Sequence, residues 1–229
     1  MHVFFESPEA DDTQRSAGGV ESLYPFLYGG GPDRPVLEAA AESARQKIAE
    51  VLGLRQEVAV AHSAALAECA AQLSKAFSAG ATLFSFGNGG SSTDAQDLAH
   101  TFIDPPPPAD PLPALSLTND VAVVTALTND VGFDVVFARQ LRAFGRPGDI
   151  AVALSTSGGS PNVLAAIEEG SQAGLITVGL AGYGGGRMAE MASLAHLFAV
   201  PSASVHRVQE VQTTLYHVLW EATRAALAT

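Results

Sequence analysis

The sequence predicts an α/β fold in which a doubly wound parallel sheet of five strands lies between two layers of helices. Three observations support this prediction. Beyond Gly80, short apolar runs of β type alternate with helical stretches. Such alternation is typical of parallel strands that helices cover on both faces. Two of the turns from strand to helix are also rich in glycine and serine, and ligands of these folds bind at such turns.

The chain ahead of the sheet is predicted to be an extension followed by two helices. Residues 1–34 carry acidic and glycine-rich pieces around one apolar island, Leu23–Tyr28. That island either docks on the chain's own core or a neighbouring subunit, or belongs to a free tail. Helices are expected over 35–53 and 56–79, which are rich in Ala, Glu, Gln and Leu and have no internal proline. The predicted organisation is therefore an extension (1–34) and one α/β domain (35–229) with an N-terminal helical pair.

The sheet elements follow in order. LTNDV occurs twice, beginning at Leu117 and Leu127, and this short period does not fit a solenoid. Each Asn-Asp pair is instead expected to begin or interrupt a helix. Strands are predicted over residues 81–86, 113–118, 149–155, 175–180 and 194–200, and helices over residues 91–103, 120–128, 133–143, 161–173, 185–192 and 204–228.

Composition narrows the classes of ligand and partner. The chain is 47% hydrophobic and 16% charged, as expected of a globular protein, and its formal net charge is -12. This charge disfavours direct binding to nucleic acid or to anionic membranes, and it requires that an anionic ligand be held mainly by neutral donors. Cys69 is the single cysteine, so an internal disulfide and a cysteine metal cluster are excluded. The first residues lack the features of a signal peptide and no apolar stretch reaches membrane-span length, so we expect a cytoplasmic protein.

Two strand-to-helix turns carry the candidate site. The first turn spans 86–94 (FGNGGSSTD), and Ser91 with Asp94 three residues later resembles a capping box. The second turn spans 155–162 (STSGGSPN), where Ser160 fits the helix N-cap and Pro161 the first helical position. Its hydroxyls and glycines at a helix N-terminus form a cradle for an anion without any positive side chain.

Charge decides which turn is expected to bind phosphate. Asp94 is expected in the first turn of its helix, where it would repel a dianion, whereas the second helix has no acid before Glu168. We therefore assign the sugar hydroxyls to the loop from Asn88 to Ser91. Either loop alone also fits a well-capped turn without a ligand. Neither loop matches the glycine pattern of dinucleotide sites or the lysine-containing nucleotide loop, so NAD and ATP are poor candidates. The phosphate is assigned to Ser155, Thr156, Ser157 and Ser160.

Several motifs together resemble one enzyme family. GNGGSSTDAQ, TNDVGFDVVFARQL, GRPGDIAVALSTSGGSPNV, LAGYGGG and HRVQE with a later histidine look like the sedoheptulose-7-phosphate isomerase family, also called phosphoheptose isomerase, of the SIS (sugar isomerase) superfamily. The resemblance runs from about residue 55 to residue 225. It implies a three-layer, flavodoxin-like α/β/α fold, a homotetramer and a role in carbohydrate metabolism. It also implies conversion of the ketose sedoheptulose 7-phosphate, or a related sugar phosphate, to an aldose phosphate.

The resemblance also implies residue roles. Asn129 and Asp130 would reach the site from a neighbouring loop, and the serine-rich loop would bind phosphate. Gln209 and His217 in the last helix would serve the reacting end. Aldose–ketose isomerisation moves a proton between adjacent carbons through an enediol, which imidazole suits because it titrates near neutrality. Taken alone, a histidine on a largely apolar helix also fits a hydrogen-bonded core residue. The sugar would contact Asn88, Gly89 and Gly90.

The sequence departs from the family at the reacting end. Where the family has a His and, four residues later, a Glu that acts as the base, this chain has Asp97 and Thr101. His206 replaces the acid that ordinarily precedes the Arg of the HRVQE segment. No cofactor is required by the expected reaction, but some members bind zinc, and a set of Asp97, Gln209 and His217 is chemically able to do so.

Two hypotheses follow from these departures. The machinery is rebuilt from Asp97, His100, His206 and His217, and the protein remains an isomerase. Alternatively, catalysis is lost and the chain is a phosphosugar-binding regulator that resembles an initiator-associating replication protein. Asp97, His100 and His206 also fit plain surface or helix-start residues. The intact loops favour the isomerase, and the missing glutamate favours the regulator.

Overall fold

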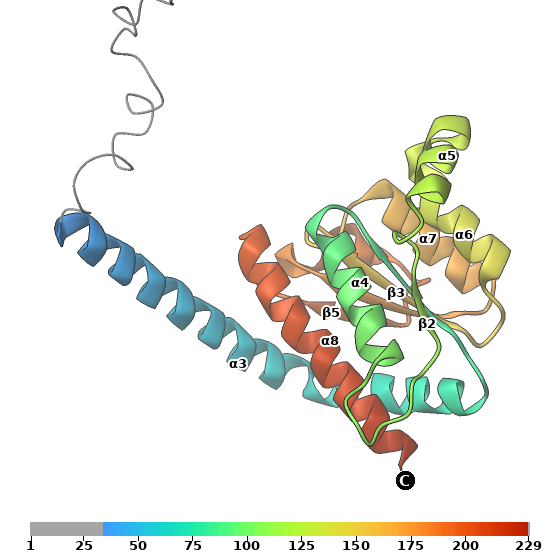
Figure 1. Cartoon of the computed structure of the whole chain (residues 1–229), viewed down its shortest axis with the longest axis horizontal. Helices are drawn as coiled ribbons and strands as arrows, with labels where there is room; N and C mark the ends of the chain where they lie inside the picture. Colours follow the sequence, from blue (N-terminus) through green and yellow to red (C-terminus); the bar gives the residue numbers. More distant parts are fainter. Residues whose placement is uncertain (1–33, 229) are drawn as a thin grey trace, which may run out of the picture. The chain divides into compact units, whose positions relative to one another are not determined.

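The computed structural model describes residues 34–228 (Figure 1). The predicted extension, apart from Arg34, and its apolar island lie outside the described residues. The chain divides into two compact units, residues 1–48 and 49–229, and the sheet belongs to the second unit. Within the described part, no helix has both the length and the apolar character that crossing a membrane requires.

A single helix, α3 (Arg34–Ser78), takes the place of the two helices expected over 35–53 and 56–79. The expected interruption is absent because Leu54 and Arg55 both have high helix propensity. Gly53 lies within the helix with no atom near its missing side chain. A glycine inside a helix costs only about 1 kcal/mol relative to alanine, which one residue in so long a helix does not turn into a break.

Five parallel strands form the sheet in the order β2-β1-β3-β4-β5, which confirms the doubly wound, flavodoxin-like prediction (Figure 1). The order reverses between β1 and β3, and this topological switch point is where such folds bind ligands. The central strands are fully buried, as expected for a sheet with helices on both faces. The strands are β1 (Leu83–Gly87), β2 (Ala114–Ser116), β3 (Ile150–Ser155), β4 (Ile176–Ala181) and β5 (His196–Ala199).

The alternation of side chains along the strands divides the core into two layers. Ile150, Val152 and Leu154 of β3 pack in one hydrophobic cluster with α4 (Gly90–Ile103) and α8 (Val205–Leu227). Ala151 and Ala153 face the opposite cluster, which contains α6 (Val136–Phe144) and α7 (Pro161–Gln172). Cys69 is fully buried in the first cluster, and burial raises the pKa of its thiol to about 12. Cys69 is therefore a buried packing residue.

The helical segments between β2 and β3 differ in part from the expectation. Asp120 caps α5 (Val121–Val131) by accepting a 3.0 Å hydrogen bond from the Val123 N–H, as predicted for the first Asn-Asp pair. The second pair instead lies in the last turn of α5, which ends before Gly132. The helix expected over 133–143 starts as a 3-10 turn, η1 (Phe133–Val135), and continues as α6.

The helix expected over 185–192 is a 3-10 segment, η2 (Tyr183–Glu190). Gly184, Gly185 and Gly186 have φ values of 72°, 100° and 53°, a left-handed conformation that an α-helix excludes. Tyr183 also has a positive φ, of 50°. Three adjacent glycines therefore direct this segment into a compact turn at the end of β4 rather than a helix.

Candidate functional site at the sheet switch point

The two glycine- and serine-rich loops lie side by side at the switch point. Gly87, the last residue of β1, is in register with Leu154 near the end of β3, so both loops leave neighbouring strands at the same sheet edge. The side-chain amides of Asn88 and Asn162 then join the loops through two reciprocal hydrogen bonds of 2.8 Å. The structure thus brings the two predicted loops together. Asn162 was not assigned to the site from sequence.

Three serine hydroxyls converge in the second loop. The Ser155 hydroxyl lies 3.1 Å from that of Ser160 and 3.5 Å from that of Ser157, which also accepts a hydrogen bond from the Gly159 N–H. Ser160 occupies the N-cap position of α7, as predicted, and Pro161 follows it, but the Ser160 hydroxyl forms no capping bond. The hydroxyls are therefore directed toward one another at the positive end of a helix, an arrangement that suits an anion.

The turn after β4 braces the second loop. The N–H groups of Gly182 and Met188 donate to the carbonyl oxygens of Thr156 and Gly158 at 3.0 Å and 2.9 Å. Gly158 has a φ of 63°, and a Cβ atom there would collide with the carbonyl oxygen of Gly185. Backbone hydrogen bonds from η2 and its N-cap residue therefore hold the loop backbone that carries the serine hydroxyls.

The first loop differs from its expected capping box. Gly89 is the N-cap residue of α4, with a φ of 56°, and no side chain caps this helix end. Ser91 lies inside the first turn and is only 4% exposed. Asp94 therefore lies in the second turn, not in the first, so repulsion by its carboxylate at the helix N-terminus does not support the assignment of phosphate to the other loop. The convergent hydroxyls of the second loop favour that assignment instead.

Gln209 reaches this first loop from α8. Its amide nitrogen donates a 3.3 Å hydrogen bond to Asp94, and its side chain lies where a Cβ atom on residue 90 would be, which requires Gly90. Burial raises the pKa of the Asp94 carboxyl, the hydrogen bond from Gln209 opposes that shift, and the charge of Asp97 adds to it. The predicted Gln209 thus lies beside the predicted sugar-binding loop.

A second pair joins the same two helices. The Tyr216 hydroxyl donates a 2.6 Å hydrogen bond to Oδ2 of Asp97, and burial together with this carboxylate raises the pKa of Tyr216. Its ring centroid lies 4.9 Å from that of His217. Nδ1 of His217 donates to the Thr213 carbonyl oxygen at 2.8 Å, so Nε2 is the acceptor in the neutral imidazole. Sequence reasoning missed Tyr216, which has the appearance of one more apolar helix residue.

Other predicted residues lie apart from this cluster. Asn129 and Asp130 are exposed at the end of α5, where their side chains share a 2.8 Å hydrogen bond. His100 is exposed and lies 3.9 Å from the carboxylate of Asp104. His206 is exposed in the first turn of α8. Of the four groups considered for a rebuilt centre, Asp97 and His217 share a contact with Tyr216.

Comparisons of the sequence and the fold with known proteins identify the family of this chain. The SIS domain family matches residues 46–182, more than half of the chain. The phosphoheptose isomerase of Desulfovibrio desulfuricans is 42% identical over 173 residues, which cover 74% of this chain and 80% of that protein. This chain belongs to the phosphoheptose isomerase family of SIS-domain proteins.

Solved structures agree with this membership. The phosphoheptose isomerase of Neisseria gonorrhoeae has a TM-score of 0.75 and 31% sequence identity, over 81% of this chain and 99% of that chain. That of Francisella tularensis has a TM-score of 0.68 and 30% identity, over 80% of this chain and 98% of that chain. The SIS fold is therefore shared along nearly the whole length of these phosphoheptose isomerases.

Two of the three side chains of the expected zinc set, Asp97 and Gln209, form hydrogen bonds with other side chains in this structure. Oδ2 of Asp97 accepts the Tyr216 hydroxyl, and the amide of Gln209 is directed to Asp94. Over residues 34–228, no three His, Cys, Asp or Glu side chains gather in a set that could hold a metal ion.

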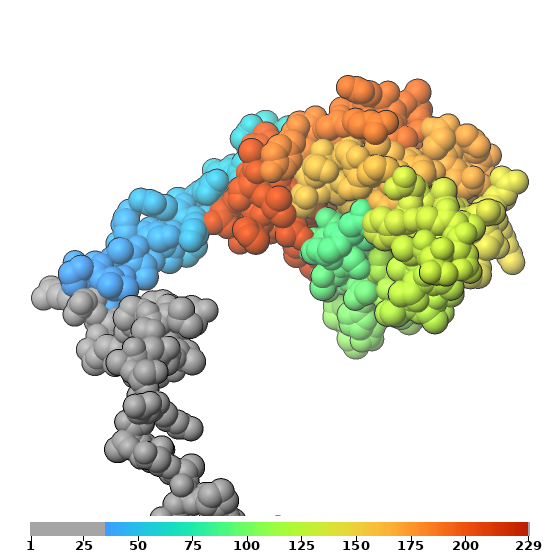
Figure 2. Space-filling view, turned by 90° about the horizontal axis from the view of Figure 1, so that it is seen from above, coloured from blue at the N-terminus to red at the C-terminus, as the bar shows by residue number. Residues whose placement is uncertain are grey.

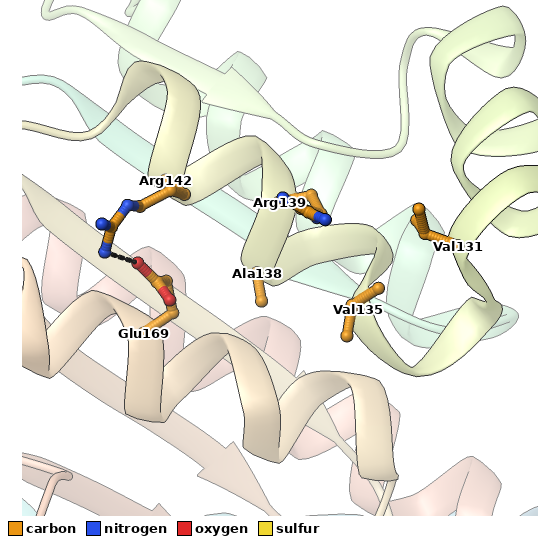
Figure 3. Close-up of a pocket in the computed structure, with 6 residues that line it drawn as sticks. All are labelled: Val131, Val135, Ala138, Arg139, Arg142 and Glu169. Atoms are coloured by element: carbon orange, nitrogen blue, oxygen red, sulfur yellow. Dashed lines mark hydrogen bonds and ion pairs between the residues drawn. The ribbon is translucent and has the colours of Figure 1, made fainter.

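A separate hollow of about 490 Å³ lies outside the switch point (Figure 3). In Figure 3, Arg142 of α6 extends toward Glu169 of α7, and the ion pair between them is 3.1 Å long. None of the predicted site residues lines this hollow, so it is not the candidate sugar site. It is lined by Val131, Val135, Ala138, Arg139, Arg142 and Glu169.

Proposed function

We propose that this protein is a sugar-phosphate isomerase that converts sedoheptulose 7-phosphate, or a related ketose phosphate, to the aldose phosphate through an enediol. The observation that carries the proposal is the Asn88–Asn162 pair, which holds the cradle of serine hydroxyls beside the loop that leads into α4. One loop offers donors for a phosphate dianion, and the other leads toward carboxylate and imidazole groups. The phosphoheptose isomerase relatives support the same reaction class.

In this proposal the chain binds the phosphate without positive side chains. Hydroxyls of the second loop and the N-terminal end of the α7 dipole stabilise the dianion. Asn88, Gly89 and Gly90 lie against the sugar hydroxyls, because glycines let the backbone approach a ligand closely. The phosphate donors are Ser155, Thr156, Ser157 and Ser160.

The reacting end lies toward α8. We propose that Nε2 of His217 exchanges a proton with the sugar oxygens during enediol formation, since Nδ1 is held by the Thr213 carbonyl. Gln209 lies against Gly90, and we propose that it donates a hydrogen bond to a sugar oxygen at this loop. No metal is required in this scheme, because proton transfer to and from carbon uses side chains alone.

We further propose that the protein is a cytoplasmic homotetramer. None of the residues of α5 is buried within the chain, although its side chains are largely apolar (Figure 2, yellow-green). Val121 is 68% exposed and Val131 46%. A largely apolar hollow of about 420 Å³ lies between α5 and α6. A second copy covering this face would bury it and would bring Asn129 and Asp130 to a neighbouring subunit's site. Light scattering of the purified protein tests the tetramer.

A regulator that binds a phosphosugar without catalysis is the second candidate. One observation favours it: Thr101, whose hydroxyl donates to the Asp97 carbonyl oxygen at 2.9 Å, stands where the family has its glutamate base. A threonine hydroxyl is not a general base at neutral pH. The loops would serve binding equally well in either protein, so turnover separates the two candidates.

Nuclear magnetic resonance of sedoheptulose 7-phosphate in deuterium oxide tests the proposal. The wild-type protein is expected to convert the sugar and to place deuterium at C2, with equal rates in the presence of a chelator and of zinc. The variant His217→Ala is expected to lose at least about 100-fold in rate while still binding the sugar. Saturable binding by the wild-type protein without turnover or exchange would refute the isomerase for this sugar and would favour the regulator or a different phosphosugar substrate.

A further inference from the structure

Two hydrogen-bonded pairs connect α4 and α8, and one of them has no role in the function proposed above. Asp94 is bonded to Gln209 and Asp97 to Tyr216. The partners on α8 are seven residues apart, or about two helical turns, so both extend toward α4. Tyr216 is not among the residues that the family resemblance assigns to catalysis. Its bond of 2.6 Å is the shorter of the two.

The Asp97–Tyr216 pair joins a buried donor to an exposed carboxylate. Tyr216 is 2% exposed, and its hydroxyl stays protonated because burial raises its pKa. Asp97, by contrast, is exposed, so its carboxylate is open to solvent on the helix that the first loop leads into. A charge-assisted bond of this kind fixes the orientation of a side chain that would otherwise rotate freely. The carboxylate is therefore held in place yet open to solvent.

Asp97 lies on α4, the helix that directly follows the predicted sugar-binding loop. It is one turn of α4 closer to this loop than Thr101. Tyr216 contacts both Asp97, through its hydroxyl, and His217, through its ring. We infer that Asp97 is the carboxylate that takes up the carbon-bound proton in this chain, and that Tyr216 is the residue that positions it. This inference rests on the proposed isomerase function.

The step balances as a proton transfer without any oxidant or reductant. Asp97 accepts the proton from C1 of the ketose, and the electrons of the broken C–H bond form the C1–C2 double bond of the enediol. The imidazolium of His217 gives a proton to the former carbonyl oxygen O2. Asp97 then returns its proton to C2, while His217 recovers a proton from O1, which becomes the aldehyde oxygen.

Four single variants of the protein, together with the Asp97→Asn, Tyr216→Phe double variant, test the two roles. Asp97→Asn removes the base and keeps the shape, and Asp97→Glu keeps a carboxylate. Tyr216→Phe removes only the hydroxyl. Thr223→Val is the matched control, because it removes another buried hydroxyl of α8, whose 2.7 Å bond goes to the Leu219 carbonyl oxygen. For each variant, kcat, KM and the incorporation of solvent deuterium at C2 are measured with sedoheptulose 7-phosphate.

Asp97→Asn is expected to lower kcat and deuterium incorporation together by about 100-fold or more, with KM changed less than about threefold. Asp97→Glu is expected to keep more activity than Asp97→Asn. Tyr216→Phe is expected to lower kcat about tenfold, and to have no further effect when Asp97 is already asparagine. Thr223→Val is expected to leave kcat unchanged.

Two results would overturn the inference, and they are distinguishable. Wild-type turnover that persists in Asp97→Asn, or a Tyr216→Phe effect no larger than that of Thr223→Val, would refute the roles of Asp97 and Tyr216 while leaving the isomerase intact. Absence of both turnover and exchange in the wild-type protein would refute the proposed function, and the base with it.

Discussion

Asn88 and Asn162 exchange two hydrogen bonds of 2.8 Å through their side-chain amides, one residue at the end of β1 and the other in the first turn of α7. Each amide donates one hydrogen bond to the other and accepts one from it, so the pair is self-complementary. Asn162 is 1% exposed, so its side-chain amide is hydrogen-bonded to Asn88 and not to solvent. The relative position of the two ligand loops is therefore fixed by side chains as well as by the neighbouring strands.

Breaking this pair is expected to affect both stability and binding. Asn162→Ala leaves the amide of Asn88 without its partner and should lower the free energy of unfolding by about 1–3 kcal/mol. It should also raise KM for the sugar phosphate, because the two loops are no longer held in a fixed position relative to each other. Urea unfolding and steady-state kinetics measure the two effects. Asn119→Ala, at an exposed position, is the control, and the Asn88→Ala, Asn162→Ala double variant should lose less than the sum of the single variants.

Removing one hydroxyl of the cradle is expected to weaken phosphate binding. Ser155→Ala deletes the hydroxyl that lies within 3.5 Å of both other serine hydroxyls, and KM should rise about tenfold with a smaller change in kcat. Inhibition by inorganic phosphate should weaken in parallel. Ser171→Ala, near the other end of α7, should change neither quantity. Equal KM values for the two variants would show that the phosphate binds elsewhere.

Gly158 and Gly159 form a matched pair for testing the brace between η2 and the second loop. Gly158→Ala forces a Cβ onto a residue with a φ of 63° and against the Gly185 carbonyl oxygen. The free energy of unfolding should therefore fall by more than about 1 kcal/mol. At Gly159 the nearest atom to a new Cβ is 3.9 Å away, so Gly159→Ala should change stability by less than about 0.5 kcal/mol. Thermal unfolding compares the two, and similar melting temperatures would contradict the brace.

Asp94 should make stability depend on pH. Burial raises the pKa of its carboxyl above the ordinary value of 3.8, so the folded state binds this proton more tightly than the unfolded state does. The contribution to stability is therefore lost as the pH rises from near 3.8 through the raised folded-state value. Asp94→Asn keeps an acceptor for Gln209 and should reduce this fall in the free energy of unfolding. Urea titrations between pH 4 and 8 measure it, and parallel curves for both proteins would refute the expectation.

Patterns of local sequence predicted most of the sheet and both loops. Apolar runs such as 149–155 and the glycine–serine turns after them depend on local chemistry, and the structure has β3 and the turn where they were expected. The N-cap position of Ser160 was predicted for the same reason. The direction of its hydroxyl was not, because Ser155 offers a competing partner that only the folded loop brings within 3.1 Å.

Contacts between distant segments could not be predicted in this way. The capping box at Ser91 and Asp94 failed because a glycine N-cap shifted the start of α4 by two residues relative to the motif. Tyr216 and Asp97 are 119 residues apart, and nothing in either local sequence signals their bond. Such pairs depend on how α4 and α8 cross, which the packing of the whole layer determines.

The brace behind the serine loop has a thermodynamic consequence. A loop that already holds its bound conformation loses little conformational entropy when a ligand arrives, because the turn that begins at Gly182 has restricted it beforehand. Its hydroxyls then replace water around the phosphate without first having to be ordered. Calorimetry of sugar-phosphate binding should accordingly find a smaller entropic opposition than in a Gly158→Ala protein, even if the two proteins form the same hydrogen bonds with the ligand.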